Sequence, residues 1–395
     1  MQSTPKSQRL TIALVGKTNA GKSTLLNRIA GQDVAIVSPQ AGTTTDVVEK
    51  AMELLPFGPV LWLDTAGWDD PTALGEARKA KTAQALARAD LVLGVTMDDG
   101  TPDTELLALS SKQEKPVVIV VTQCDIHAPS EAFLAQLRET GAQVLLASED
   151  RDTFLKALKT ALAQLLPKHF IAPPEPLSGI VPEGGTVLQI IPIDSQAPKG
   201  RIILPQVNVL RNALDRNYTS IVVTEKRIRE AAERFKPDLV VCDSQVVHTM
   251  IAELPPELPA TTYSILLARL KCDLPTLAAG AQAIRNLKDG DRILIGEACT
   301  HHAADDDIGR VKIPRWIRQY TGKELTFDVA SGKDFPEDLK RYALIIHCGG
   351  CMINRAFMLW RLEQAKAAGI PITNYGVAIS ETQGVLKRVL APFGL

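Results

Sequence analysis

Nine consecutive residues near the N-terminus have the composition of a phosphate-binding loop. The segment GKTNAGKST runs from Gly16 to Thr24 and matches the pattern GxxxxGK[ST], between an apolar run (11–15) and a helix-forming stretch. Its glycines let the backbone fold so that amide groups face a phosphate chain, while Lys22 can reach the outer phosphates and Ser23 can bind Mg²⁺. The segment therefore predicts a nucleotide site formed by Gly16, Asn19, Ala20, Gly21, Lys22, Ser23 and Thr24.

Two further segments follow in the order that a nucleotide-dependent switch requires. The apolar run PVLWLD (59–64) ends in Asp64 and continues as Thr65-Ala66-Gly67, and the threonine-rich segment GTTTD (42–46) precedes it. Asp64 can hold Mg²⁺, and the Gly67 amide can contact a γ-phosphate. We expect Lys22, Thr44, Asp64 and Gly67 to carry the catalytic work.

These motifs resemble those of the TrmE–Era–EngA-like branch of translation-factor-related GTPases, which are GxxNxGKS, GTT and DTAG. The resemblance implies that Thr44 is the switch ligand for Mg²⁺. It also implies that Asn19 helps to bind a K⁺ ion, which supplies the positive charge that an arginine finger supplies elsewhere. Trp68 matches the apolar residue after DTAG, so slow, cation-dependent GTP hydrolysis is implied. A loop-stabilising side chain is the alternative for Asn19.

The base-recognition segment departs from this resemblance. The family carries Asn-Lys-x-Asp after the corresponding strand, whereas this chain carries TQCD at 122–125. Asp125 can still accept two hydrogen bonds from guanine, but the asparagine contact and the lysine stem are missing. Each lost hydrogen bond of about 1 kcal/mol lowers affinity severalfold. We expect a weakened preference for guanine, with Ala147 and Ser148 as the last base-contacting loop.

Cysteine and histidine residues form a second group in the last third of the chain. Cys299-Thr300-His301-His302 follow the apolar run RILIGEA, and HCGGC (347–351) ends the run ALIIHC. Both segments lie where strands of an α/β sheet end, which is where such sheets place ligands. Three thiolates with one or two imidazoles suit either tetrahedral zinc or a 4Fe–4S cluster with an open fourth iron. The residues alone leave both metals open.

The order of CxH and HCxxC behind an Era-like domain resembles the HydF family, whose GTPases mature FeFe hydrogenase, and the resemblance covers essentially the whole chain. It implies a 4Fe–4S cluster held by Cys299, Cys348 and Cys351, with His301 and His347 as the histidines of the motif. It also implies a homodimer or higher homo-oligomer. The implied role is a scaffold or carrier that receives a diiron precursor made with the radical-SAM maturases HydE and HydG, and delivers it to the hydrogenase HydA.

Strand and helix patterns alternate along almost the whole chain, which predicts three α/β domains with mostly parallel sheets. Residues 8–168 form the P-loop GTPase domain, and the Pro- and Gly-rich residues 169–186 form a linker. The middle domain spans 187–260 and, by the HydF resemblance, pairs two chains. The cluster domain spans 261–395, after a second proline-rich stretch.

Composition, net charge and hydropathy limit the classes of protein to which this chain can belong. The 395 residues carry a net charge of −1 and are 45% hydrophobic, which excludes a disordered chain and disfavours nucleic-acid binding. No apolar run approaches the roughly 18 residues that span a bilayer, so we expect a cytoplasmic protein without membrane contact. The alternative function is an Era-like GTPase that binds RNA or ribosomes and carries a structural zinc site. A stand-alone iron–sulfur redox enzyme would leave the switch motifs unexplained.

Overall fold

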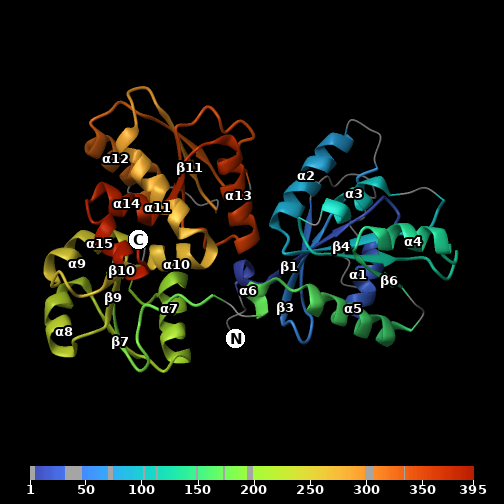
Figure 1. Ribbon diagram of the computed structural model, residues 1–395, viewed down its shortest axis with the longest axis horizontal. Helices are drawn as coiled ribbons and strands as arrows, with labels where there is room; N and C mark the ends of the chain where they lie inside the picture. Colours follow the sequence, from blue (N-terminus) through green and yellow to red (C-terminus); the bar gives the residue numbers. More distant parts are fainter. Residues whose placement is uncertain are drawn as a thin grey trace. The chain divides into compact units, whose positions relative to one another are not determined.

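The computed structural model describes residues 5–31, 47–69, 74–100, 103–112, 114–147, 150–171, 174–193, 199–298, 307–332 and 334–395. It divides into two compact units, Met1–Pro173 and Pro174–Leu395. The division falls inside the stretch 169–186 that the sequence marks as a linker. Helices and mostly parallel strands alternate in both units (Figure 1), as the alternating pattern predicts.

A six-stranded sheet forms the centre of the first unit, in the order β2-β3-β1-β4-β5-β6. All neighbouring strands are parallel except β2 and β3, which are antiparallel. The strands are β1 (Leu10–Val15), β2 (Val48–Glu53), β3 (Pro59–Asp64), β4 (Leu91–Thr96), β5 (Val117–Val121) and β6 (Gln143–Leu146). Because β1 is buried along its whole length, both faces of the sheet must be covered.

Helices cover both faces of this sheet. Leu26 of α1 and Leu158 of α5 pack in the core on one face, and Leu106 of α3 and Leu134 of α4 pack in the core on the other. The helices are α1 (Lys22–Ala30), α2 (Leu74–Arg88), α3 (Thr104–Lys112), α4 (Glu131–Glu139), α5 (Arg151–Leu165) and α6 (Lys168–Ile171). The arrangement is a doubly covered α/β sheet with its loops at the strand ends.

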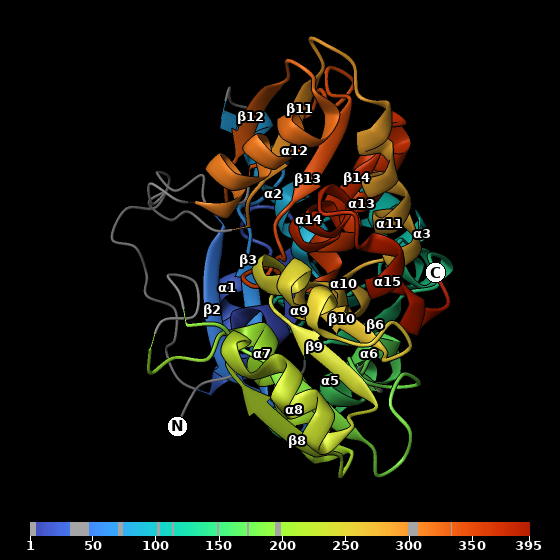
Figure 2. The same cartoon turned by 90° about the vertical axis from the view of Figure 1, so that its left-hand side faces the viewer.

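The second unit contains two parallel four-stranded sheets, which Figures 1 and 2 show in green to yellow and in orange to red. The first has the order β10-β9-β7-β8 and the second β12-β11-β13-β14. The strands are β7 (Thr186–Ile190), β8 (Thr219–Val223), β9 (Leu239–Cys242), β10 (Ala260–Thr262), β11 (Arg292–Gly296), β12 (Thr326–Ala330), β13 (Leu344–His347) and β14 (Ile372–Asn374).

The helices of the second unit complete two apolar cores. Val209 of α7 and Leu266 of α10 pack with the first sheet, and Ile317 of α12 and Ile379 of α14 pack with the second. The helices are α7 (Leu204–Asp215), α8 (Ile228–Phe235), α9 (Val247–Glu253), α10 (Tyr263–Lys271), α11 (Leu274–Gln282), α12 (Ile313–Thr321), α13 (Arg355–Ala368), α14 (Tyr375–Thr382) and α15 (Leu386–Leu390). None of the described helices is long and apolar enough to cross a membrane.

The apolar runs that predict strands all form strands, with ends that differ by a few residues. Two strands have no such run. The residues of β2 are mostly polar and partly exposed, so their sequence lacks the apolar signal of a buried strand. The three residues of β10 begin at Ala260, the last residue of the proline-rich stretch expected to be a loop. The predicted fold class, a P-loop domain followed by two further parallel α/β sheets, is confirmed.

Candidate nucleotide site and cysteine loop

The phosphate loop joins β1 to α1 and needs glycine at two positions. Gly16 and Gly21 have φ angles of 147° and 84°, which side-chain-bearing residues rarely adopt. A Cβ atom on Gly16 would also lie 2.0 Å from the carbonyl oxygen of Val95. The loop therefore folds back tightly and brings its amides and the N-terminus of α1 together, which is the arrangement that binds phosphate.

Lys22 is the cation of this loop. Its Nζ donates to the carbonyl oxygens of Gly16 at 2.9 Å and Lys17 at 2.6 Å, and only 9% of the residue is exposed. Burial lowers the pKa of Lys22, while the charges of Asp64 and Asp69 oppose that shift. A buried ammonium group among carbonyl oxygens is well placed to neutralise a phosphate.

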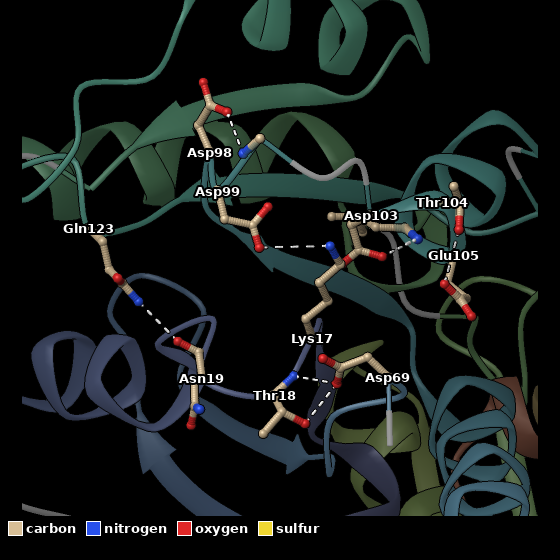
Figure 3. A network of polar contacts seen from close by, with 12 residues as sticks. Lys17, Thr18, Asn19, Asp69, Asp98, Asp99, Asp103, Thr104, Glu105 and Gln123 are labelled. Carbon is tan, nitrogen blue, oxygen red and sulfur yellow. Dashed lines mark hydrogen bonds and ion pairs between the residues drawn. The ribbon is translucent and has the colours of Figure 1, made fainter. Parts of the chain in front are cut away.

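The segment after β3 packs directly on the phosphate loop. Gly67 approaches Thr18 so closely that a Cβ atom would lie 2.2 Å from the Thr18 hydroxyl oxygen. Oδ1 of Asp69 accepts hydrogen bonds from the Thr18 amide and hydroxyl, each at 2.7 Å (Figure 3). Burial would raise the pKa of Asp69, but these two hydrogen bonds outweigh it and hold the pKa below its ordinary value. Gly67 and Asp69 thus both contact Thr18 and join the segment after β3 to the phosphate loop.

Asp64, the predicted Mg²⁺ ligand, ends β3 beside a cation from the edge strand. The Nζ atom of Lys50 in β2 lies 3.2 Å from Oδ2 of Asp64, and both side chains are mostly buried. The β2 and β3 strands pair antiparallel, with Lys50 opposite Trp62 and Val48 opposite Asp64. A metal ion at Asp64 would therefore share this carboxylate with Lys50.

Trp68, the apolar residue after DTAG, is buried but keeps one polar contact. Its indole Nε1 donates to Oδ1 of Asp103 at 3.1 Å. The same oxygen accepts from the amide of Leu106 at 3.1 Å, so Asp103 also satisfies an amide in the first turn of α3. Burial raises the pKa of Asp103, and the hydrogen bonds from Leu106 and Trp68 oppose that shift. Trp68 is therefore anchored to α3 and not exposed to solvent.

One cavity of about 830 Å³ adjoins the phosphate loop. It brings together most of the predicted nucleotide ligands, namely Asn19, Gly21, Lys22, Ser23, Thr24, Asp125 and Ala147. These residues meet because β1, β5 and β6 are parallel strands of one sheet and end on the same side. The volume is in the range of small-molecule and cofactor sites.

The residues that replace the expected Asn-Lys pair contact the phosphate loop. Oγ1 of Thr122 donates to the carbonyl oxygen of Ala20 at 2.7 Å and lies 3.1 Å from that of Thr96. Nε2 of Gln123 donates to the carbonyl oxygen of Asn19 at 2.9 Å, and Figure 3 shows the two side by side. The sequence predicted only lost contacts here, because nothing in it reveals which backbone oxygens a hydroxyl will reach.

The cysteine loop begins at the end of β13. Sγ of Cys348 accepts hydrogen bonds from the amides of Ala298 at 3.1 Å and Gly350 at 3.4 Å. Gly350 has a φ angle of 65°, so the turn that carries Cys351 needs its glycine. Both thiols are partly exposed and neither forms a disulfide. Amide hydrogen bonds to sulfur favour the thiolate form and are among the contacts that tune iron–sulfur clusters.

Comparisons with known proteins divide the chain into three matches. Residues 11–123 match the family model described as 50S ribosome-binding GTPase. Residues 177–272 match the hydrogen maturase F dimerization domain, and residues 275–392 match the hydrogen maturase F tetramerization domain. The last two together span more than half of the chain. The chain belongs to the hydrogen maturase F (HydF) family.

Curated relatives match part of this HydF-family chain. The tRNA modification GTPase MnmE of Halorhodospira halophila is 41% identical over 166 residues, 40% of this chain and 35% of that protein. GTPase Der of Persephonella marina is 36% identical over 140 residues, 34% and 31% of the two chains. The chain thus spans about a third of the length of these relatives. A crystal structure of Era with MgGDPNP and a segment of 16S ribosomal RNA is 29% identical, with a TM-score of 0.33, and covers 40% of this chain and 56% of that chain.

Four residues that the HydF motif or the nucleotide site would use lie outside the described residues. They are Thr44, Ser148, Cys299 and His301. Among the residues that the structure does describe, no group of three or more His, Cys, Asp or Glu side chains is arranged to hold a metal ion. Cys348 and Cys351 are the cysteines of the CxH and HCxxC motifs that lie within the described residues. Soft thiolates with amide donors fit an iron–sulfur cluster or zinc.

His347 uses both ring nitrogens in contacts with the protein. Nε2 lies 2.7 Å from Nη1 of Arg361, and Nδ1 lies 2.7 Å from the carbonyl oxygen of Cys348. Because a guanidinium group only donates, Nε2 must accept and Nδ1 must carry the proton. Burial, and next the charge of Arg361, lower the pKa of His347 to about 3. The imidazole is neutral and orients the backbone of Cys348.

Two buried cations near this loop were not predicted from the sequence. Lys271 ends α10, and Arg361 lies in the middle of α13. Their surrounding residues show ordinary helical patterns, and burial of both follows only from the packing of α10 and α13 in the second unit. Two further cysteines of that unit, Cys242 and Cys272, are buried thiols.

Proposed function

We propose that this HydF-family chain is a GTP-hydrolysing scaffold or carrier that binds a 4Fe–4S cluster and assembles or delivers a diiron precursor during maturation of FeFe hydrogenase. The observation that carries the proposal is the Cys348 turn. Its sulfur accepts hydrogen bonds from two backbone amides, and a second thiol, that of Cys351, lies three residues further along the chain. The same chain has a phosphate loop that is hydrogen-bonded to the segment after DTAG. A redox enzyme that uses no nucleotide would not need the phosphate loop and the DTAG segment.

The nucleotide cavity supports binding and hydrolysis of GTP. In this proposal the loop amides and Lys22 bind the phosphates, and Gly67 senses the γ-phosphate. Ser23, Thr44 and Asp64 hold Mg²⁺, and Asn19 contributes to a K⁺ site. Asp125, with Ala147 and Ser148, accepts the guanine edge. The cavity that these residues line in part, and the direct contacts between Thr18 and the segment after Gly67, support this assignment.

The cysteine loop supports cluster binding. In this proposal Cys299, Cys348 and Cys351 supply three thiolates, and a cluster held this way supplies an iron open to a further ligand, suited to holding and releasing cargo. The chain's own residues prepare the site: amides point at the Cys348 sulfur, and His347 fixes the carbonyl of the same residue. Because both nitrogens of His347 are engaged, we assign it this positioning role and leave His301 as the candidate histidine ligand.

The regions that match dimerization and tetramerization domains support a homo-oligomer. We place the pairing function in residues 187–260, between the GTPase domain (8–168) and the cluster domain (261–395). β8 lies at one edge of its sheet, and an edge strand can pair with a second chain. The maturases HydE and HydG and the hydrogenase HydA are the proposed partners.

Iron and sulfide analysis of anaerobically purified protein, with EPR of the reduced sample, tests the cluster assignment. We expect about four iron atoms per chain, from the stoichiometry of the cluster, and a loss of most of that iron in Cys348→Ser. The matched control is Cys242→Ser, a buried cysteine in β9 of the other sheet, which should keep its iron. Stoichiometric zinc without iron, together with salt-sensitive RNA binding, would instead identify the Era-like alternative.

Phosphate release from GTP in K⁺ and Na⁺ buffers tests the nucleotide assignment. We expect slow turnover that is faster in K⁺, that requires Mg²⁺, and that is lost in Lys22→Ala. The control variant Lys79→Ala changes an exposed lysine of α2 and should turn over normally. Equal rates in K⁺ and Na⁺ would remove the potassium role of Asn19 and leave its side chain a loop-stabilising one.

A further inference from the structure

Lys271 places a buried positive charge against the cysteine loop. Its Nζ donates to the carbonyl oxygens of Gly350 at 2.6 Å and Ile353 at 2.8 Å, which lie on either side of Cys351. Only 9% of the residue is exposed. Within the part of the chain that the structure describes, Lys271 therefore has neutral oxygen atoms as its hydrogen-bond partners.

Arg361 places a second buried charge beside the same loop, in contact with His347. The residue is fully buried, and its guanidinium lies 4.6 Å from the ring centre of Phe357 and 5.1 Å from that of Phe335. It bonds to His347 at 2.7 Å and to the carbonyl oxygen of Gly332 at 2.8 Å. Within the described part of the chain these partners are again neutral.

Buried cations that no anion accompanies are costly, because removing an ion from water carries a penalty that pairing offsets. Cys348 is an opposing charge that both cations share. Burial lowers the pKa of Lys271 to about 8, and the charges that oppose this shift are those of Cys351 and Cys348. Burial likewise lowers the pKa of Arg361 to about 10, and the charges of Cys348 and next of Asp334 oppose this shift. Among the described residues, Lys271 contacts the cysteine loop through Gly350 and Ile353, and Arg361 contacts it through His347. The cysteine loop is therefore where an anionic group would meet both charges.

We propose that Lys271 and Arg361 are charge-compensating positioning residues of the cluster site, so that the site favours an anionic metal–thiolate group and binds its reduced form more tightly than its oxidised form. This inference rests on the proposed cluster binding. Reduction of a 4Fe–4S cluster adds one electron and one negative charge, and a nearby cation in a low-dielectric site stabilises the more negative state. Removing either cation should lower the midpoint potential.

Variants of Lys271 separate charge from hydrogen bonding. Lys271→Gln keeps an N–H donor for the loop carbonyls but removes the charge, whereas Lys271→Arg keeps the charge. Arg361→Lys keeps the charge of Arg361 and removes its planar stacking. Lys366→Gln is the matched control, because Lys366 is an exposed lysine on α13 that pairs with Glu363.

The experiment is an EPR-monitored titration of the full-length, iron-loaded protein with dithionite and mediators. In Lys271→Gln we expect the preference for the reduced over the oxidised cluster to fall about tenfold. For a one-electron couple this shifts the midpoint potential by about 59 mV to more negative values. Lys271→Arg, Arg361→Lys and Lys366→Gln should stay close to the wild type. Iron-loaded Lys271→Gln with an unchanged potential would overturn the inference. If Lys271→Gln takes up no iron, uptake by Lys271→Arg supports the charge requirement, and failure of both reduces Lys271 to a structural tether.

Thermal unfolding of the iron-free protein provides a readout that does not depend on the cluster. Without a bound anionic group the buried ammonium is uncompensated, so Lys271→Gln should melt at or above the wild-type temperature. A melting temperature far below that of Lys271→Arg would contradict the inference. Absence of iron from the wild type would contradict the proposed function alone, and the unfolding comparison would still decide whether the charge of Lys271 is uncompensated.

Discussion

The hydroxyl of Thr122 lies 2.7 Å from the carbonyl oxygen of Ala20, so the base-recognition segment is bonded to the phosphate loop. Thr122 directly follows β5, and Ala20 precedes Gly21, the residue before α1. The bond joins two segments that line the nucleotide cavity through one buried side chain. It fixes their spacing although the usual Asn-Lys pair is missing.

Thr122→Val should weaken binding of GTP and GDP equally. Valine has the shape of threonine but cannot donate, so the buried carbonyl of Ala20 loses its partner and the loop loses a restraint. A bond worth 0.5–1.5 kcal/mol corresponds to about a two- to tenfold loss of affinity. Titration with fluorescent nucleotides measures it. Thr160→Val, which removes an exposed hydroxyl on α5, is the control. Unchanged affinity in folded Thr122→Val would show that the bond does not position the loop.

Asp125→Asn should reverse base preference. A carboxylate accepts hydrogen bonds from two guanine N–H groups, whereas an amide offers one acceptor and one donor, which matches xanthine. We expect GTP affinity to fall by more than about tenfold, from two hydrogen bonds to a charged group, and XTP affinity to rise. Competition between GTP, XTP and ATP measures this. A parallel loss of all three would mean that Asp125 is structural, and retained GTP binding would place the base elsewhere.

Lys50→Met should lower the Mg²⁺ concentration needed for GTP hydrolysis. The ammonium of Lys50 shares the Asp64 carboxylate at 3.2 Å, and its removal leaves that mostly buried carboxylate to the metal alone. We expect a severalfold lower half-saturating Mg²⁺ concentration, measured by phosphate release at fixed GTP. Lys79→Met, on the exposed surface of α2, should leave the requirement unchanged. An unchanged Mg²⁺ dependence in Lys50→Met would indicate that Asp64 does not hold the ion.

The sequence predicts the residues that act at strand ends because local patterns encode them. Gly16 and Cys348 directly follow strands and Asp64 ends one, and apolar runs form the parallel strands whose ends meet at one edge of a sheet. The motif spacing was sufficient to place Lys22 and Asp125 beside the same cavity.

The contacts across the fold could not be predicted in the same way. Lys271 lies in LARLKC, a stretch whose charge spacing suits a helix exposed to water, and its burial depends on packing far along the chain. The sequence predicts Trp68 only as an apolar residue of the switch. Its hydrogen bond to Asp103 joins residues that are separated in the sequence by a helix and a strand. These partners are set by tertiary packing, which a single sequence does not specify.

Asp103→Asn should stabilise the protein at neutral pH and lose that advantage in acid. Burial holds the pKa of Asp103 above its ordinary value of 3.8 in the folded state, so the folded protein binds this proton more tightly than the unfolded chain. Stability is therefore lost as pH rises from the unfolded toward the folded pKa, and asparagine avoids that loss while still accepting from Trp68. Melting temperatures from pH 3 to pH 8 measure the difference.

Asp98→Asn is the matched comparison, because its effect on stability should depend on pH in the opposite direction. Hydrogen bonds from the amide and hydroxyl of Ser130, both at 2.8 Å, lower the pKa of the exposed Asp98. Its contribution to stability is present above the ordinary carboxyl pKa and is lost as pH falls through the folded value. Asp98→Asn should thus be less stable than the wild type at pH 7 and similar to it at pH 3. The differences in melting temperature between each variant and the wild type should change with pH in opposite directions. If they changed in the same direction, burial would not control the ionisation of Asp103.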